Sequence, residues 1–393
     1  MGNSLDEMLA WMAREVDPAA NAWEENQLMP AEILRDLARY GLTAACVPKE
    51  YGGLALDSLA LGRLSARLGR GSCSLLSIFV VHAMVVQAVS RFGDATQKSA
   101  LLPRLAKGEL RAAFALTEPD IGSDATAVAC VARRTPTGFV LEGRKKWISA
   151  SRYADIFMVL VRLSGEAGED EGLAVLLVPA TTPGLCITPL QGLLGFRAAG
   201  IAELHFENCQ LPAVLALADA TPSALLGTPG SGFSFVGSHA LDTGRFIIGW
   251  GGVGILEGCL EASVAYAKER IQFGQPLEKH QLIRELIADI ATDFAAAQAL
   301  SEKAATERDA AGPNAVMSVT QAKYFSSRAS VRAASAALQI HGGNGCAPDF
   351  PLQRYFRDAK ILEIIEGSSQ MQQLMIAGAA LMRGRRKKHG KTH

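Results

Sequence analysis

Glu366 is the residue whose type and neighbours point most directly to chemistry. It lies in the run IIEGSSQ, residues 364–370, with two isoleucines before it and a glycine after it. Apolar surroundings disfavour the charged form of a carboxyl group, so its pKa rises and it becomes a better general base near neutral pH. The glycine allows the backbone to come close to a substrate. The alternative interpretation is an ordinary acid at a helix start, followed by a polar turn.

Two clusters in the middle of the chain are suited to hold a flat, polar cofactor. The run ALTEPDIGSD, residues 115–124, offers hydroxyl and backbone N–H groups on a turn, which suit a polar cofactor edge. The run KKWIS, residues 145–149, allows Trp147 to stack on a flat ring while Ser149 bonds the edge of that ring. The alternatives are a helix cap and turn for the first cluster, and a strand-packing Trp for the second.

Two clusters in the C-terminal half are suited to contact phosphate groups. The run ERIQFGQPL, residues 269–277, ends a helical pattern with Arg270, which can pair with a diphosphate. Its alternative is a helix capped at Gly274. The run QIHGGNG, residues 339–345, allows close backbone approach to phosphates but lacks the GxGxxG spacing of a Rossmann fold. His341 by itself is more typical of a structural residue.

Three compositional zones carry these clusters. Residues 1–112 follow a helical pattern, with a helix start at Pro30 and two apolar helices between Leu54 and Phe92. Residues 113–225 contain short β-rich runs separated by turn sequences, which predicts a small sandwich or barrel. The predicted strands are 128–133, 138–142, 156–162, 173–179, 185–189 and 202–206.

The third zone, residues 226–383, returns to long helical segments with apolar spacing near 3.6, which predicts a bundle of antiparallel helices. Residues 384–393 form a dense basic run, for which we expect a disordered tail. A docking role of this tail toward an acidic partner is the alternative.

Bulk composition narrows the class of protein. The 39 basic and 39 acidic residues balance, which argues against nucleic-acid or membrane-surface binding. The seven cysteines show no CxxC or Cys/His cluster, so we expect free thiols and no metal site. No secretory signal pattern is seen, and the apolar stretch Leu75–Val89 is shorter than the roughly 20 residues of a membrane span. The expectation is a cytoplasmic enzyme with no membrane partner.

The clusters occur together and in order, and in this arrangement the chain resembles the acyl-CoA dehydrogenase superfamily of flavoproteins over essentially its whole length. The resemblance implies an α+β fold with an N-terminal helical domain, a central β-barrel or sandwich domain and a C-terminal four-helix bundle. It also implies FAD bound between the β domain and the bundle, and a homodimer or homotetramer. The matching motifs are Leu116-Thr117-Glu118-Pro119-x-x-Gly122-Ser123-Asp124, Lys146-Trp147-Ile148-Ser149, Arg270-x-x-Phe273-Gly274, His280-Gln281, Gln339-x-x-Gly342-Gly343-x-Gly345, Arg357-Asp358-Ala359-Lys360 and Glu366-Gly367-Ser368-Ser369-Gln370.

The resemblance assigns roles by position. Glu366 would be the catalytic base that takes the α-proton of an acyl thioester, while the β-hydride passes to flavin N5. Substrate contacts would come from Ser123, Asp242, Arg245 and Gly367. FAD contacts would come from Leu116, Thr117, Ser123, Trp147, Ser149, Arg270, Phe273, Gln281, Gln339, Gly342, Gly343, Ser368 and Gln370.

Three departures from the family pattern narrow the resemblance. Ile365 stands where an aromatic residue usually precedes the base, the loop 195–200 reads GFRAAG, and Trp250 is bulky just after the substrate-facing segment. These traits resemble a subgroup that acts on acyl-carrier-protein thioesters in polyketide or hybrid peptide biosynthesis, such as those leading to hydroxymalonyl or methoxymalonyl extender units. Within the resemblance, the substrate carrier is therefore either an acyl carrier protein or CoA.

Other functions stay open at this point. A catabolic short-chain acyl-CoA dehydrogenase would pass electrons to an electron-transfer flavoprotein. A flavin oxidase or monooxygenase on the same fold would use oxygen, and such enzymes generally lack the glutamate. A flavin-binding assembly scaffold is the non-enzymatic alternative. The sequence leaves open the acyl group, the electron acceptor and the size of the oligomer.

Overall fold

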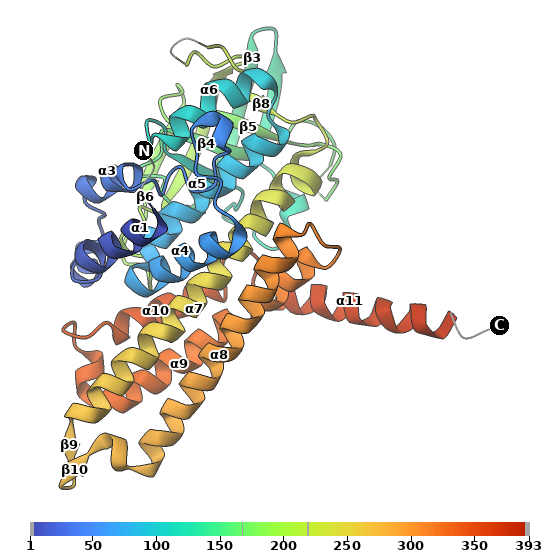
Figure 1. Ribbon diagram of the computed structural model, residues 1–393. Coiled ribbons are helices and arrows are strands. Elements are labelled where there is room, and N and C mark those ends of the chain that lie inside the picture. Colours follow the sequence, from blue (N-terminus) through green and yellow to red (C-terminus); the bar gives the residue numbers. More distant parts are fainter. Residues whose placement is uncertain (1–3, 167, 218–219, 390–393) are drawn as a thin grey trace. The chain divides into compact units, whose positions relative to one another are not determined.

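The computed structural model describes residues 4–166, 168–217 and 220–389, with only the backbone described after Met382 (Figure 1). The chain divides into two compact units. The first unit comprises residues up to 56 together with 72–244. The second comprises residues 57–71 and those from 245 onward. The helix α7 (Ser238–Glu269) contributes to both units.

The first unit combines five α-helices with one sheet. Several helices begin at caps that the sequence supplies: the Ser4 hydroxyl accepts from the backbone N–H of Glu7, and Asp94 does the same for Gln97. Helix α5 is apolar and largely buried, and it packs against the first strand (Figure 1). The helices are α1 (Leu5–Trp11), α2 (Ala20–Asn26), α3 (Ala31–Arg39), α5 (Cys73–Phe92) and α6 (Ala95–Ala106).

Eight strands form the sheet of the first unit, in the order β6-β7-β3-β2-β4-β5-β8, with β1 paired to β4. Strands β2 and β4 meet at one residue pair, Val131 and Arg162, whereas the other neighbours pair over longer stretches. All seven residues of β4 are buried, which explains its continuous apolar run. The strands are β1 (Ala112–Ala115), β2 (Val131–Thr135), β3 (Gly138–Ile148), β4 (Ile156–Arg162), β5 (Leu173–Pro179), β6 (Leu185–Pro189), β7 (Ala202–Pro212) and β8 (Leu225–Leu226).

The predicted strands 156–162, 173–179 and 185–189 are confirmed residue for residue. Two others extend further than predicted, because β3 and β7 pair with each other as far as Ile148 and Pro212. The prediction for 128–133 was wrong at its start: β2 begins at Val131, since a carboxylate takes the N–H groups of Ala129 and Cys130.

The second unit is helical apart from one short hairpin. Helices α8 and α9 pack along each other, and α10 and α11 both pack against α9 (Figure 1). The elements are α4 (Ser58–Gly71), the larger part of α7, α8 (Gln281–Asp309), α9 (Ala315–His341), α10 (Leu352–Leu362) and α11 (Ser369–His389), with the hairpin β9 (Ile271–Gln272) and β10 (Gln275–Pro276). A disordered tail was predicted from residue 384. Helix α11 runs to His389, and residues 390–393 lie outside the described part of the chain.

Glycines bring α4 and α7 into close contact within the second unit. A Cβ on Gly62 would stand 2.3 Å from the indole of Trp250, and one on Gly254 would stand 1.8 Å from the carbonyl oxygen of Ala66. Trp250 therefore packs into the α4–α7 contact and is nearly fully buried. The large indole of Trp250 fits at this contact because Gly62, which faces it, has no side chain.

Gly254→Ala is expected to lower the free energy of unfolding by about 1–3 kcal/mol, because the added methyl meets a backbone carbonyl that cannot move aside. Gly378→Ala on α11 is the matched control, since no atom lies within 4 Å of its added Cβ. The control is expected to be neutral or slightly stabilising. Thermal or denaturant unfolding measures both, and equal effects of the two substitutions would contradict the packing argument.

Two helical segments are long and apolar enough to cross a membrane, Cys73–Phe92 and Gly232–Glu269. Of their most apolar windows, 89% and 72% are buried inside the structure. Burial of this kind is also what a core helix shows, so length and composition alone do not mark either segment as a membrane span.

Candidate active site

Glu366 lies on the short connection between α10 and α11, not inside a helix. Its backbone has φ +54°, and the following Gly367 has φ +85°. The left-handed region costs little for glycine but is unfavourable for a glutamate, so the surrounding contacts must hold this turn. The turn starts where α10 ends, and it closes with a hydrogen bond from the backbone N–H of Ser369 to the carbonyl of Glu363, 2.9 Å long.

Three side chains hold the carbonyl groups of this turn. Arg245 of α7 donates through Nε to the carbonyl of Glu366 over 3.2 Å. The carbonyl of Gly367 accepts from Lys323 Nζ at 2.9 Å and from Gln372 Nε2 at 3.0 Å. The predicted site residues Glu366, Gly367 and Arg245 are thus brought together, and helices α7, α9 and α11 each contribute one donor.

The carboxylate of Glu366 is poised for proton transfer. Its Oε2 atom is buried and has no hydrogen-bond partner among the described residues. Burial raises the pKa of Glu366 to about 7, and the positive charges of Arg245 and Lys323 act in the opposite direction. The carboxyl group therefore changes charge near neutral pH, as a general base requires.

Of the two isoleucines before Glu366, Ile364 is 55% exposed, whereas Ile365 is partly buried. The prediction that both isoleucines desolvate the carboxylate is therefore wrong for Ile364, because an exposed side chain removes little water from its neighbour. Folding of the connection onto the helices that carry Arg245 and Lys323 is what buries the carboxylate.

Sequence reasoning missed Lys323, which is completely buried on α9. A signal was present: Val319, Ala322, Ser326 and Ser330 mark the buried face of α9, and Lys323 falls on that same face. A lysine on a buried helical face needs a partner, and in this helix the partner is the turn that carries Glu366.

In the first unit, the predicted flavin-facing residues Leu116, Thr117 and Trp147 gather at the end of β3. The backbone N–H of Lys146 donates to the carbonyl of Thr117 over 2.8 Å. The pairing of β3 is interrupted between Lys145 and Ile148, where Trp147 has φ +63° and its side chain is 52% exposed. The strand-packing alternative for Trp147 was therefore wrong, because the irregularity turns the indole out of the sheet.

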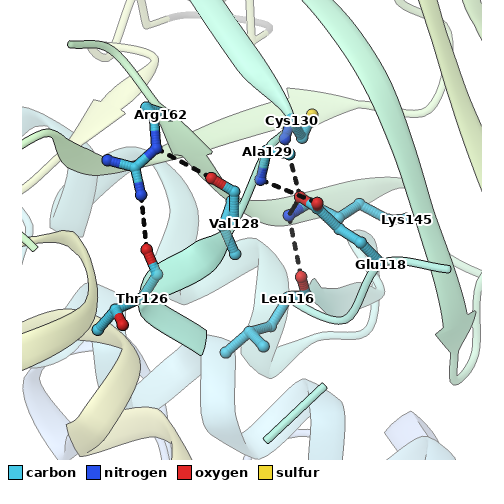
Figure 2. Close-up of polar contacts among 8 residues, drawn as sticks. All are labelled: Leu116, Glu118, Thr126, Val128, Ala129, Cys130, Lys145 and Arg162. Atoms are coloured by element: carbon cyan, nitrogen blue, oxygen red, sulfur yellow. Dashed lines mark hydrogen bonds and ion pairs between the residues drawn. The ribbon is translucent and has the colours of Figure 1, made fainter. Parts of the chain in front are cut away.

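A buried ion pair fixes the loop that carries Leu116 and Thr117 (Figure 2). Lys145 Nζ lies 2.7 Å from Glu118 Oε1 and 2.9 Å from the carbonyl oxygen of Leu116. The carboxylate of Glu118 also accepts from the backbone N–H groups of Ala129 and Cys130, both at 2.9 Å. The carboxylate of Glu118 thus accepts three hydrogen bonds, one from Lys145 and two from backbone N–H groups, and these bonds compensate for its burial.

Arg162 secures the next part of the same loop. Its guanidinium donates to the carbonyls of Thr126 and Val128 at 2.6 and 3.0 Å (Figure 2). It also donates to the carbonyl of Glu169 at 2.9 Å. These bonds lie at the end of β4, where β2 and β4 pair through a single residue. A side chain thus satisfies carbonyl groups that no strand neighbour reaches.

Three further residues predicted to contact the cofactor or substrate lie in the first unit. Ser149 is partly exposed and accepts a hydrogen bond from the Ser77 hydroxyl at 2.9 Å, while Ser123 is exposed on the loop after Glu118. Asp242, a predicted substrate contact, is partly buried on α7, one helical turn before Arg245.

The predicted phosphate-contacting residues of the second unit are all exposed. Arg270 follows α7, and Phe273, 95% exposed, sits with Gly274 at the tip of the β9–β10 hairpin. Both tip residues have positive φ, +51° and +77°, as in a tight two-residue hairpin turn. The alternative of a helix capped at Gly274 was wrong, because α7 ends at Glu269. Gln281 begins α8 beyond the hairpin.

The glycine-rich run after α9 forms an open turn. Gly342 and Gly343 are exposed, as is Gln339, and no atom lies within 4 Å of a Cβ built on either glycine. His341 is buried, stacks on Tyr266 with ring centroids 4.1 Å apart, and bonds the carbonyl of Ala337. The structural interpretation of His341 is confirmed.

Within each unit, the predicted residues fit a part of a flavin nucleotide. Trp147 offers an exposed aromatic face to a flat ring. The open backbone at Gly342 and Gly343 leaves room for a phosphate group, and Ser368 and Gln370 line a polar pocket in the second unit. A metal has no comparable site, since the described residues contain no group of three or more His, Cys, Asp or Glu side chains able to hold one. The seven cysteines are all free thiols.

The order of helical, β and helical segments, with a partly buried glutamate on a loop whose Oε2 atom is buried, is that of an FAD-dependent oxidoreductase of acyl thioesters. Three family models match in sequence: the acyl-CoA dehydrogenase N-terminal domain over residues 4–109, the middle domain over 113–209 and the C-terminal domain over 230–381. The chain belongs to the acyl-CoA dehydrogenase family, whose members are FAD-dependent flavoproteins. The predicted α+β fold and the predicted FAD cofactor are thereby confirmed.

Similar proteins cover nearly the full length of the chain. An acryloyl-CoA reductase (NADH) of Anaerotignum propionicum is 38% identical over 96% of this chain and 94% of its own. The human mitochondrial short-chain specific acyl-CoA dehydrogenase is 35% identical over 94% and 87%.

Two solved structures are similar in fold. FkbI, described for biosynthesis of the methoxymalonyl extender unit of the polyketide Fk520, is 34% identical with a TM-score of 0.86, covering 95% of this chain and 99% of its own. AnaB, a prolyl acyl carrier protein oxidase, is 26% identical with a TM-score of 0.86, covering 97% and 100%.

Proposed function

We propose that this chain oxidises a short acyl thioester and that Glu366 is the base that removes its α-proton. The observation that carries the proposal is the buried, unpartnered Oε2 of Glu366, on a turn fixed by Arg245, Lys323 and Gln372. A carboxylate in this setting is desolvated and has a raised pKa, and the backbone that carries it is fixed, which are the properties of an efficient general base.

The protein and the cofactor would supply different parts of the reaction. The α C–H bond breaks and its proton goes to Glu366, while the β C–H bond breaks and leaves a carbon–carbon double bond. Bound FAD supplies the acceptor for the β-hydride. The task of the protein is to orient the base, exclude water from it and stabilise the charge that develops on the thioester carbonyl.

For the substrate we propose an acyl group carried on an acyl carrier protein in natural-product biosynthesis. Support comes from the similarity to FkbI, described for a polyketide extender unit, and to AnaB, which acts on an acyl carrier protein. The Ile365 departure adds to this, because it changes the side chain directly before the base. Trp250 adds nothing, since it packs against α4.

The carrier is tested by offering one acyl group, such as butyryl, on CoA, on a stand-alone carrier protein and on free pantetheine. We expect kcat/KM for the carrier-bound form to exceed that for CoA by about tenfold or more, a difference of about 1.4 kcal/mol. The pantetheine thioester controls for contacts with the shared arm. Equal turnover on CoA and on carrier protein would overturn the carrier assignment and leave the oxidation chemistry intact.

Two relatives favour alternatives to this proposal. The similarity to the short-chain specific acyl-CoA dehydrogenase favours a CoA thioester as substrate, and faster turnover on CoA than on carrier protein would support that alternative. AnaB is an oxidase, so fast reoxidation of the reduced flavin by air would favour oxygen over an electron-transfer flavoprotein as acceptor. The homodimer or homotetramer implied by the resemblance stays a prediction.

A further inference from the structure

Lys323 is a buried lysine whose Nζ contacts the turn that carries the base, and its role goes beyond packing. Its side chain is completely buried, and Nζ donates over 2.9 Å to the carbonyl of Gly367. The neutral Gln372 donates to that same carbonyl over 3.0 Å. A hydrogen bond to this oxygen therefore does not require a charge, yet the position on α9 holds a lysine.

Burying an ammonium group is unfavourable unless another charge compensates it. Burial lowers the pKa of Lys323 to about 7, while the negative charges of Glu366 and Glu363 raise it. In the other direction, Lys323 and Arg245 lower the pKa of Glu366 against the effect of burial. Each of the two buried groups thus favours the ionised form of the other.

We propose that Lys323 is a positioning residue for the proton-abstracting step: its ammonium group fixes the Gly367 carbonyl and brings a positive charge to the turn that carries Glu366, which favours the ionised form of the base. This proposal rests on the assignment of Glu366 as the base. Hydrogen bonding alone is supplied by Gln372, so the distinct contribution of Lys323 is its charge.

The charge has a definite effect on pH dependence. Flavin reduction requires the carboxylate form of Glu366, so the rate falls as the pH drops below the pKa of that group. The charged groups that act on this turn are Arg245 from α7, Lys323 from α9, and Glu363 at the end of α10. Without the charge of Lys323, Arg245 remains as the positive charge among the described residues that favours ionised Glu366. The fall in rate on the acidic side of the pH profile, its acid limb, should therefore move to higher pH.

The test is the rate of anaerobic flavin reduction by butyryl thioester, followed by the loss of oxidised-flavin absorbance, on either side of pH 7. Three FAD-loaded variants are compared with the unmodified chain. Lys323→Met removes charge and hydrogen bond together. Lys323→Gln removes the charge but keeps an amide donor. Gln372→Met removes a hydrogen bond to the same carbonyl without changing charge.

We expect both Lys323 variants to move the acid limb upward by about one pH unit, about a tenfold loss of rate below the limb. Gln372→Met is expected to leave the limb in place. If Lys323→Met does not fold, the pH profile of Lys323→Gln still tests the role of the charge. The proposal is overturned if the folded Lys323 variants keep the original limb, if Gln372→Met shifts it equally, or if flavin reduction is lost at every pH.

A failure of this proposal can be told apart from a failure of the proposed function. If Glu366→Gln still allows full flavin reduction, the base itself is wrongly assigned. If Glu366→Gln abolishes reduction while Lys323→Gln keeps the pH profile of the unmodified chain, only the role of Lys323 is wrong.

Discussion

Glu366→Gln is expected to slow flavin reduction by the acyl thioester by about 10²–10⁴-fold, the range that a positioned general base contributes. The amide has nearly the shape of the carboxylate, so the turn held by Arg245, Lys323 and Gln372 should persist. What is lost is the ability to accept the α-proton. Stopped-flow measurement of the loss of oxidised-flavin absorbance separates this step from later electron transfer.

Glu257→Gln provides a matched control. Glu257 is a partly buried glutamate on α7 whose pKa burial also raises, but it is not part of the turn that carries Glu366. It should reduce flavin at the rate of the unmodified chain. Full reduction by the Glu366 variant would remove this residue from the mechanism and favour a flavin-binding scaffold or an oxidase with a different base.

Glu366→Gln should also change the free energy of unfolding in a way that depends on pH. The pKa of Glu366 is raised from an ordinary 4.5 to about 7. Between these two values the folded chain keeps a proton that the unfolded chain has lost, so stability falls as the pH rises through this window. Glu366→Gln should therefore be more stable than the unmodified chain above pH 7 and show no such gain below 4.5. A gain of the same size at both ends would contradict a desolvated carboxylate.

Lys145→Met is expected to lower the free energy of unfolding by about 3–5 kcal/mol, the effect of leaving one member of a buried ion pair without its partner. Glu118 would keep its bonds from the backbone N–H groups of Ala129 and Cys130 but lose the positive charge 2.7 Å away. Leu116 would lose a hydrogen bond to its carbonyl as well. Denaturant unfolding measures the loss.

Lys146→Met is the control, because the neighbouring lysine has no ion pair with any residue that the structure describes, and its Nζ lies 5.1 Å from the centroid of the Trp147 ring. It should stay within about 0.5 kcal/mol. Adding Glu118→Gln to Lys145→Met should restore part of the stability, since a neutral amide oxygen still accepts from the backbone without needing a cation. If the single and double variants are equally unstable, loss of packing and not an unpaired charge explains the effect.

The sequence predicted the elements of this fold well where local pattern and final environment agree. Strand β5 is an apolar run and β4 is apolar up to its last residue, Arg162; both were predicted with correct ends. The start of β2 was misplaced because the partner of the Ala129 and Cys130 N–H groups is Glu118, a residue distant in sequence. No local pattern in 128–133 could reveal that carboxylate.

Some features of the candidate site could also be predicted from the sequence, whereas others depend on the folded structure. Glu366 could be singled out from its neighbours and its place in an ordered set of motifs, and a raised pKa could be expected. The cause could not, because the burial of its carboxylate depends on how the connection folds against α7 and α9, and Ile364 points largely into solvent. Lys323 escaped notice because a single lysine in a helical pattern is usually on the exposed face.

The clamp formed by Glu118, Lys145 and Arg162 has a consequence for how a cofactor arrives. A loop that must become ordered on binding loses about 1–2 kcal/mol of conformational entropy per residue, which weakens association. Residues 116–130 have few strand hydrogen bonds, yet buried side chains of the same unit hold them through contacts within the chain. If Leu116 and Thr117 contact flavin as the resemblance implies, the ordering of this loop is part of folding, and FAD binding does not have to supply it.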